Sequence, residues 1–356
     1  GFQDHLNKLI PPGCQEVDEN GTLLHSFETI KSLLWDRPGV GHFWIPPVLL
    51  VSLPAELWQV LSFWAWSHPN REYSMLSRQE AVRFALFWHL TVWNNKKAAR
   101  WAFDYIKKNK EAAVFPGTAL YELFAGNGED RCAHKLISPE EFTRKLCKEE
   151  NSRWRTDAER FVEKDNRNEL GSHWWWNGKK MLPWLQKDYI CTVFQDYVPL
   201  TDHEDDVPYD VDHMCPFKDW GDDWRNLHNR LDVAEDLKEK VRVCRDAVGG
   251  GIGNLQLLAS PVNRGRQADD IAVKMPFISR EDQPPMADDA QAMADFAFAP
   301  EHREIWNRVS RPGEVNNRRW DEDRLKAFQR AVELRAAWLY QRFHDDLGYG
   351  SWTKGK

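Results

Sequence analysis

The sequence predicts a mainly α-helical protein with a Trp-rich helical body, a small unit of two strands and a helix, and a C-terminal helix. Apolar residues recur at helical spacing through the first half of the chain and again near its C-terminus. Between them, from about residue 200, acidic and turn-forming residues precede a short apolar run suited to a strand. We therefore divide the chain into a Trp-rich helical domain (1–198), a hairpin-containing module with a helical insertion (199–285) and a C-terminal segment that packs on the body (286–356).

The first half contains a long helix that we expect to begin at Ser77. Ser77 and Glu80 have the spacing of a capping box, in which each side chain accepts a hydrogen bond from the backbone amide of the other residue. Apolar residues follow at helical spacing, namely Ala81, Ala85, Trp88 and Val92. This pattern predicts a helix that is buried on more than one side.

Two further helices are predicted in this half. Ser138 and Glu141 form a second capping box, with Pro139 at the first helical position. Residues 98–113 predict a helix whose exposed face carries Lys107, Lys108 and Lys110. The 19 tryptophans are expected to fill the core and the contacts between helices.

The C-terminal helix is predicted by one apolar stripe. Its members are Leu325, Phe328, Val332, Ala336, Leu339 and Phe343. The basic residues that lie off this stripe are Arg324, Lys326, Arg330 and Arg342. Arg318, Arg319 and Arg324 are either a DNA-facing patch or the exposed end of a helix, and the sequence favours neither.

The net charge, the cysteine spacing and the hydropathy of the chain limit the classes of protein to which it can belong. The net charge of −7 gives no general attraction to nucleic acid, so DNA contacts have to come from local basic clusters. The six cysteines form no C-x-x-C pair, which argues against a zinc ribbon and a secreted disulfide framework. The most apolar stretch, residues 43–66, is interrupted by three prolines and Glu56, so no membrane span is expected. These features favour a reduced, cytoplasmic protein, and the start at Gly1 suggests a fragment of a longer polypeptide.

Three short sequence segments contain the candidate catalytic and metal-binding residues. They are Tyr-Asp-Val-Asp-His-Met-Cys-Pro at 209–216, Gly-Asn-Leu-Gln-Leu-Leu at 253–258 and Asn-Arg-Gly-Arg at 263–266. Phosphodiester hydrolysis needs a base to activate water, a cation to neutralise phosphoryl charge and a rigid frame. Asp212 and His213 offer a carboxylate and an imidazole on opposite faces of a strand end. Taken alone, this pair fits a buried structural pair as well as a catalytic one.

Two asparagines complete the set. Asn263 is expected in the first turn of a helix begun by Ser260 and Pro261, where its amide oxygen can reach Mg²⁺ or Mn²⁺. Asn254, at the start of the second strand, can hydrogen-bond across the hairpin to the backbone near His213 and hold the orientation of the ring.

This pattern resembles the ββα-metal core of HNH endonucleases, whose usual sequence motifs are Asp-His-x-x-Pro, Asn-Leu-x-Leu-Leu and Asn-x-x-Lys. The nine-residue step from Asn254 to Asn263 also resembles the HNH domains of RNA-guided effector nucleases. The resemblance implies a metal-dependent nuclease in which His213 is the general base and Asn254 the structural asparagine of the catalytic unit. It implies Asp212 and Asn263 as the metal ligands.

Arg264 and Arg266 are expected to bind DNA phosphates, because a helix start also attracts anions. Arg266 stands where this family commonly has Lys, a change that keeps the positive charge. A long segment with a predicted helix, residues 224–247, separates the first two pieces, so this helix has to be an insertion that still lets the hairpin close. The zinc-binding cysteines of some HNH families are missing, so packing alone has to hold the scaffold.

The Trp-rich body followed by these pieces is similar to the C-terminal half of GmrSD-type and SspE-type phage-defence restriction proteins. Those proteins begin with a ParB-like nucleotide-hydrolysing domain that carries an Asp-Gly-Gln-Gln-Arg signature, which is not found in this sequence. The resemblance implies DNA as the substrate and such a domain as a possible partner in a longer polypeptide.

Three other features have a functional and a structural interpretation. The acidic residues 202–206 are a second metal site or, as the sequence favours, a solvated loop. Residues 249–253, rich in glycine, are a phosphate cradle or, as is favoured without a following Lys-Ser or Lys-Thr, a flexible lead-in to the strand. His203 and His228 are favoured as surface residues over metal ligands.

The sequence therefore predicts a Mg²⁺- or Mn²⁺-dependent HNH endonuclease that nicks or cuts DNA in the restriction of phage or modified DNA. One alternative is a catalytically silent HNH-like module that contacts DNA or docks a partner domain. Another is a toxin nuclease directed at RNA, since the same motif serves both substrates.

Overall fold

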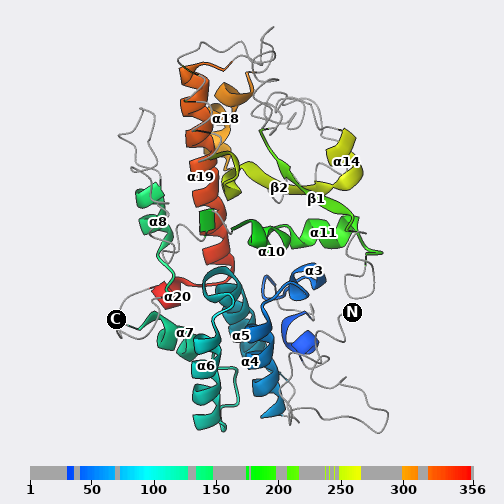
Figure 1. The fold of residues 1–356 in the computed structure, drawn as a ribbon, viewed down its shortest axis with the longest axis vertical. Helices are drawn as coiled ribbons and strands as arrows, with labels where there is room; N and C mark the ends of the chain where they lie inside the picture. The colour runs from blue at the N-terminus through cyan, green and yellow to red at the C-terminus, as the bar shows by residue number, and fades with distance from the viewer. Residues whose placement is uncertain are drawn as a thin grey trace.

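The computed structural model describes residues 30–35, 41–68, 73–126, 134–146, 174–175, 178–197, 207–215, 237, 240, 244, 248–265, 299–311 and 320–353. Helices predominate among these residues, which also form one two-stranded sheet (Figure 1). The prediction of a mainly helical protein with a short hairpin is confirmed at this level.

The N-terminal half of the described chain consists of helices that pack against one another. They are α3 (Pro47–Leu50), α4 (Ala55–Trp66), α5 (Met75–Phe87), η1 (Trp88–Val92), α6 (Lys96–Lys108), α7 (Gly117–Ala125) and α8 (Pro139–Leu146). α4 contacts α6, and α7 contacts both α5 and α6, so these helices form one bundle in the lower half of Figure 1. α5 continues into η1, a π-helical turn, and both are buried on several sides, as predicted.

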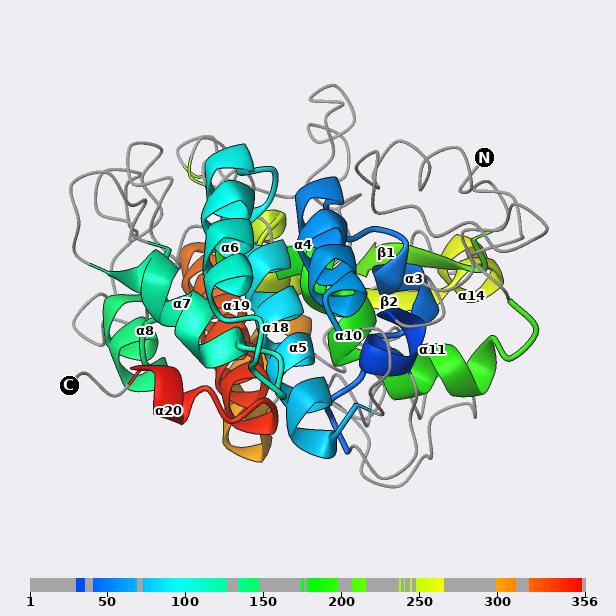
Figure 2. The same cartoon turned by 90° about the horizontal axis from the view of Figure 1, so that it is seen from below.

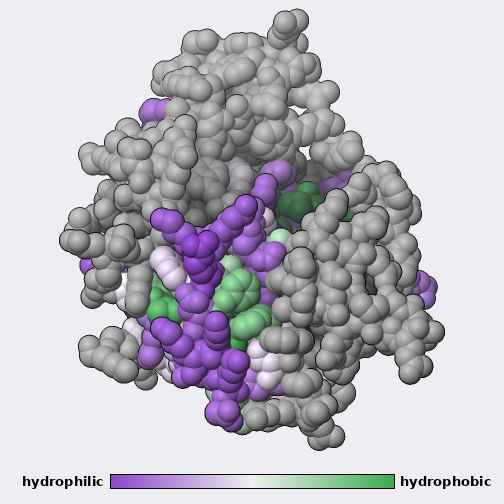
Figure 3. Space-filling view, turned by 60° about the horizontal axis from the view of Figure 1, so that its bottom comes forward, coloured by the Kyte–Doolittle hydropathy of each residue, from purple (hydrophilic) through white to green (hydrophobic). Residues whose placement is uncertain are grey.

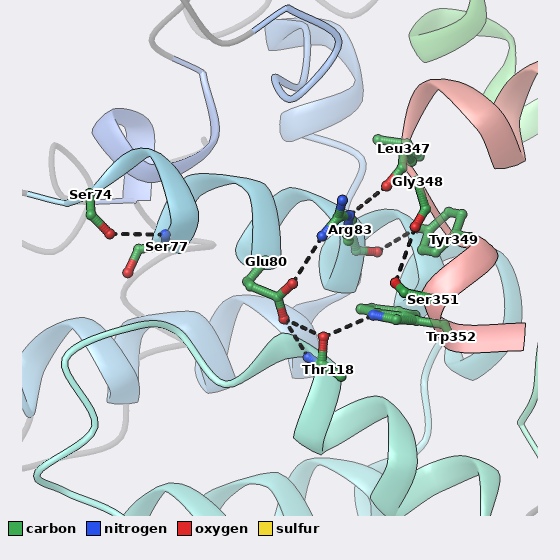
Figure 4. A network of polar contacts seen from close by, with 10 residues as sticks. All are labelled: Ser74, Ser77, Glu80, Arg83, Thr118, Leu347, Gly348, Tyr349, Ser351 and Trp352. Carbon is green, nitrogen blue, oxygen red and sulfur yellow. Dashed lines mark hydrogen bonds and ion pairs between the residues drawn. The ribbon is translucent and has the colours of Figure 1, made fainter. Parts of the chain in front are cut away.

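The start of α5 differs from the prediction. Ser74, rather than Ser77, is the N-cap, and its Oγ accepts a hydrogen bond from the Ser77 amide. Ser77 and Glu80 are buried, and Glu80 reaches across to α7 (Figure 4). The Ser77 hydroxyl accepts from the Phe115 amide, while Glu80 Oε2 accepts from the amide and the hydroxyl of Thr118. The predicted capping box is therefore wrong, because partners distant in the sequence bind both side chains.

Glu80 caps α7 from a different helix. Pro116 occupies the N-cap of α7 and makes no side-chain capping bond. A carboxylate beside a helix N-terminus accepts from its unpaired amides and interacts favourably with its dipole. Gly117 permits this approach, because a Cβ at this position would overlap the carbonyl oxygen of Glu80.

Two other predicted helices form close to their expected positions. The Ser138 hydroxyl accepts from the Glu141 amide at 3.1 Å, which confirms the predicted start of α8. α6 is capped by Asn95 and ends at Lys108, short of the predicted end. The predicted lysine face is exposed, at Lys107, Lys108 and Lys110. On the face drawn in Figure 3, hydrophilic residues of the described chain lie around a smaller group of hydrophobic ones.

The second half of the described chain builds the hairpin between helices. Its elements are η5 (Gly178–Met181), α10 (Leu182–Leu185), α11 (Lys187–Val193), β1 (Tyr209–His213), η9 (Ile252–Asn254), β2 (Leu255–Ala259), α14 (Ser260–Gly265), η10 (Pro300–His302), α18 (Arg303–Ser310), α19 (Glu322–Asp346) and α20 (Gly350–Thr353). Figure 1 shows the hairpin beside α19, with α10 and α11 below it. Figure 2 shows α20 next to α7, which it contacts.

The long helix α19 joins the hairpin to the helical body. It contacts α8, α18 and η9. All six residues of the predicted apolar stripe are buried, which confirms the stripe. Arg324 is buried as well: its guanidinium carbon lies 4.4 Å from the centroid of the Trp320 ring, and its Nε donates to the Val309 carbonyl oxygen. Both interpretations of Arg324, as a DNA-facing or an exposed residue, are therefore wrong, and Arg318 and Arg319 lie outside the described residues.

Many of the described tryptophans serve the core, as predicted. Those that are almost completely buried are Trp64, Trp88, Trp174, Trp184, Trp306 and Trp320. One hydrophobic cluster includes residues of the helical body, the hairpin and α19, so the hairpin shares a core with the helices around it. Across the described residues, we find no helix that is both long and apolar enough to cross a bilayer.

Candidate active site

β1 and β2 form an antiparallel hairpin that leads directly into α14. The register pairs Tyr209 with Ala259 and His213 with Leu255, and α14 begins at Ser260 without an intervening loop. The predicted order of strand, strand and helix is therefore present. Every residue of β2 is buried, which explains why its apolar residues do not alternate with exposed polar ones.

The outer edge of β2 is closed by side chains rather than by a third strand. Gln186, between α10 and α11, donates from Nε2 to the Leu257 carbonyl oxygen at 3.2 Å and accepts from the Leu257 amide at 2.6 Å. The Ala259 amide donates to the Tyr189 hydroxyl at 3.1 Å. An open strand edge leaves backbone groups unpaired and invites other chains to add to the sheet. These side chains satisfy that edge and attach the hairpin to the helical body.

Arg335, in α19, also binds backbone groups near this edge of β2. Its Nη1 donates to the carbonyl oxygens of Gly253 and Leu255, both at 3.0 Å. Burial, followed by the like charge of Arg342, lowers the pKa of Arg335 to about 9. The guanidinium therefore remains protonated at neutral pH and holds the start of β2 against α19.

The glycine-rich segment before β2 is explained by close packing. A Cβ on Gly253 would overlap the Val332 carbonyl oxygen in α19, and a Cβ on Gly251 would come within 2.7 Å of the Trp175 indole. Both glycines therefore allow the backbone to approach other parts of the protein. This supports a structural lead-in to the strand over a phosphate cradle.

Asn254 holds the turn that follows His213. Its Oδ1 accepts from the Cys215 amide at 2.9 Å, and its Nδ2 donates to the carbonyl oxygens of Gly249 at 2.9 Å and Cys215 at 3.4 Å. Its backbone oxygen accepts from the Met214 amide at 2.8 Å. These bonds confirm the predicted link from Asn254 across the hairpin to the backbone next to His213.

Asp212 and His213 lie at the end of β1, as predicted. Asp212 is only 4% exposed, and its Oδ2 accepts from Gln256 Nε2 at 3.0 Å. Gln256 stands opposite Asp212 in the register, so the carboxylate is held by its cross-strand neighbour. His213 is partly buried, and alternation along β1 places it on the other face of the strand.

Asn263 hydrogen-bonds a different aspartate from the one that the motif pairs it with. It lies in the first turn of α14, and its Nδ2 donates to Asp210 Oδ2 at 3.2 Å. Asp210 and Asp212 are two residues apart on β1 and therefore share one face of the hairpin. Asp210 is thus a candidate site residue that the HNH motif does not single out, although the Asp-x-Asp spacing in a strand is a signal for it.

Several predicted residues lie outside the described part of the chain. They are the acidic residues 202–206, His203, His228, Arg266 and, for its side chain, Arg264. Of the predicted helix 224–247, the structure describes Leu237, Lys240 and Cys244, each as helical. Lys240 Nζ lies 3.4 Å from Glu322 Oε2, which places this part of the insertion beside the start of α19.

The side chains on this face of the hairpin offer oxygen ligands. A carboxylate has about four lone-pair sites, so Asp210 and Asp212 can each accept a hydrogen bond and still bind a cation. Among the described residues, no three His, Cys, Asp or Glu side chains gather into a metal-binding group. A cation held here would therefore need the Asn263 amide oxygen and water beside the carboxylates. Such a donor set fits hydrated Mg²⁺ or Mn²⁺ better than Zn²⁺, which prefers nitrogen and sulfur.

No family model, no curated protein and no solved structure matches this chain.

Proposed function

We propose that this protein is a metal-dependent HNH-type endonuclease that hydrolyses DNA phosphodiester bonds. The main support is the hairpin with its trailing helix, which assembles the separate pieces of the motif on one frame. Asn254 holds the turn directly after His213, and α14 brings Asn263 to β1. An isolated structural Asp-His pair needs neither of these features, whereas a hydrolytic site needs its base and its cation ligands on a common support.

In the proposed reaction His213 is the general base. Its imidazole nitrogen takes a proton from a water molecule, the water oxygen forms a bond to phosphorus, and the bond from phosphorus to the leaving oxygen breaks. Asp212 and Asn263 would hold Mg²⁺ or Mn²⁺, which neutralises charge on the phosphoryl oxygens when bound. Asn254 holds the backbone beyond His213, so it contributes through the position of the base.

The experiment is a comparison of plasmid cleavage by the native chain and by His213→Ala. With Mg²⁺ or Mn²⁺ present, the native chain should convert supercoiled plasmid to nicked or linear DNA, and the variant should be slower by about 10²- to 10⁴-fold. His42→Ala is the matched control, because His42 is exposed and belongs to a different part of the fold. Equal cleavage by the native chain and His213→Ala would contradict the role of His213 as the base. No cleavage by either protein would favour a silent DNA-binding or regulatory module.

DNA is the proposed substrate because of the resemblance to phage-defence restriction proteins. Arg264 and Arg266 are the candidate phosphate ligands, and a ParB-like nucleotide-hydrolysing domain is the proposed partner in a longer polypeptide. RNA of the same sequence, incubated in parallel with modified and unmodified plasmid, separates restriction of DNA from an RNA-directed activity.

A further inference from the structure

We infer that Asp210 is a positioning residue that orients the Asn263 carboxamide, so that the amide oxygen faces the cation. This inference rests on the proposed function, since it concerns how the same site binds its metal. It assigns a role to a residue that the motif leaves without one.

The argument begins with the two ends of the carboxamide. Only its oxygen can bind a cation, and only its nitrogen can donate a hydrogen bond. Asn263 Nδ2 lies 3.2 Å from Asp210 Oδ2. An ionised carboxylate accepts hydrogen bonds and donates none, so the pair is favourable only with the nitrogen directed at Asp210. The alternative orientation would bring two oxygens together.

Fixing the nitrogen also fixes the oxygen. The two terminal atoms of a planar carboxamide point in different directions, so the bond to Asp210 directs Oδ1 away from that carboxylate. Partners that orient a metal ligand in this way commonly affect metal affinity by about 10- to 100-fold when they are removed. Asn263 is partly buried in α14, and its side chain is short. A single hydrogen-bonding partner is therefore enough to fix the orientation of its carboxamide.

A similar pair of a carboxylate and a carboxamide lies two residues further along β1. Asp212 accepts from the carboxamide of Gln256, just as Asp210 accepts from that of Asn263. Both aspartates lie on one face of β1, and α14 contacts both strands. The carboxamide of Gln256 comes from the sheet itself, whereas that of Asn263 comes from α14. The Asp210 bond therefore ties the helix that carries one metal ligand to the strand that carries the other.

The test separates hydrogen bonding from charge with two variants. Asp210→Asn retains an oxygen that can accept from Asn263 and removes the negative charge, whereas Asp210→Ala removes both. Mn²⁺ binding, measured from the electron paramagnetic resonance signal of free Mn²⁺, should weaken by about tenfold or more in Asp210→Ala and by no more than about threefold in Asp210→Asn. Far-ultraviolet circular dichroism and thermal melting establish that each variant is folded.

A double variant makes the test specific to positioning. Because Asp210 acts through Asn263, Asp210→Ala combined with Asn263→Ala should bind Mn²⁺ no more weakly than Asn263→Ala alone. Additive losses, or equal losses in Asp210→Asn and Asp210→Ala, would overturn the inference and make Asp210 a direct ligand or a charge contribution.

Cleavage gives a second and independent readout. In Asp210→Ala the Mn²⁺ concentration for half-maximal plasmid cleavage should rise about tenfold, with a maximal rate close to that of the native chain. If the native chain binds Mn²⁺ with the expected dependence on Asp210 but cuts no nucleic acid, the positioning role stands and the nuclease proposal fails. If the native chain cuts plasmid and Asp210→Ala needs no additional Mn²⁺, the nuclease proposal stands and the positioning role fails.

Discussion

The backbone of Gly253 lies against the carbonyl oxygen of Val332 in α19, with no room for a side chain between them. This contact puts the start of β2 directly on the longest helix of the described chain. Arg335, one turn further along α19, donates to carbonyl oxygens on both sides of Asn254. The residue that holds the turn after His213 is therefore itself held by α19.

Gly253→Ala should destabilise the protein. The added methyl group would overlap the backbone of α19, so the two elements have to separate, at a cost of about 1–3 kcal/mol or more in the free energy of unfolding. Urea denaturation measures the change. Gly350→Ala is the control, because a Cβ at Gly350 meets no atom within 4 Å. A Gly253→Ala protein as stable as the control would show that β2 is not held against α19.

Gln186→Leu should loosen the outer edge of β2. The substitution keeps a side chain of similar size but leaves the amide and the carbonyl group of Leu257 without their partners, which costs about 2–6 kcal/mol for the two groups together. Gln195→Leu is the matched control, because Gln195 is exposed. Hydrogen exchange should also accelerate at Leu257 in the Gln186 variant. An unchanged exchange rate there would contradict the assigned role of Gln186.

Asn254→Ala should reduce cleavage without weakening metal binding. The variant removes the bonds that hold the turn after His213, so the position of the base is affected while Asp212 and Asn263 remain. The maximal rate should fall by at least about tenfold, with the half-maximal Mn²⁺ concentration unchanged. Asn109→Ala controls for loss of an exposed asparagine. A shift in Mn²⁺ affinity would instead make Asn254 part of the metal site.

His89 should make the protein sensitive to mild acid. Burial, followed by the charge of Lys180, lowers the pKa of His89 from 6.5 to about 3. The unfolded chain therefore binds a proton at this residue between these pH values while the folded chain does not, so stability falls as the pH falls below 6.5. The loss from this group between pH 6.5 and pH 5 is about 2 kcal/mol.

The measurement compares native protein and His89→Leu at pH 7 and at pH 5. The native chain should lose about 2 kcal/mol more of its unfolding free energy than the variant does. Contributions from His302 and His344, whose pKa values are also lowered chiefly by burial, cancel in this comparison. Equal losses in the two proteins would show that His89 stays accessible to protons in the folded state.

Local patterns predicted most of the elements correctly. The Ser138 cap and the buried stripe of α19 each depend on residues close together in the sequence, and so does the direct step from β2 into α14. The start of α5 was not predictable in this way. Ser77 and Glu80 have the spacing of a capping box, but Phe115 and Thr118 bind them instead.

The residues of the candidate site also divide into those that the sequence predicted and those that it did not. Strand alternation predicts that Asp212 and His213 lie on opposite faces of β1. The bond from Asn254 to Cys215 spans 39 residues, so it was predicted from the resemblance to the HNH motif and not from a local pattern. The motif did not indicate Gln186, Tyr189 or Arg335, since each of these binds backbone groups at the edge of β2 from a distant part of the chain. Backbone groups carry no sequence signature, so a side chain that pairs with them cannot be recognised before the chain is folded.

The amino-acid sequence by itself determined which segments become helices, which two become strands and which chemical groups stand at the strand ends. Only the tertiary structure decided how the edge of β2 is closed, why Gly251 and Gly253 are glycines and which aspartate meets Asn263. The physical reason is range: helical and strand periodicity act over a few residues, whereas close approach and hydrogen bonding to backbone depend on elements that folding brings together.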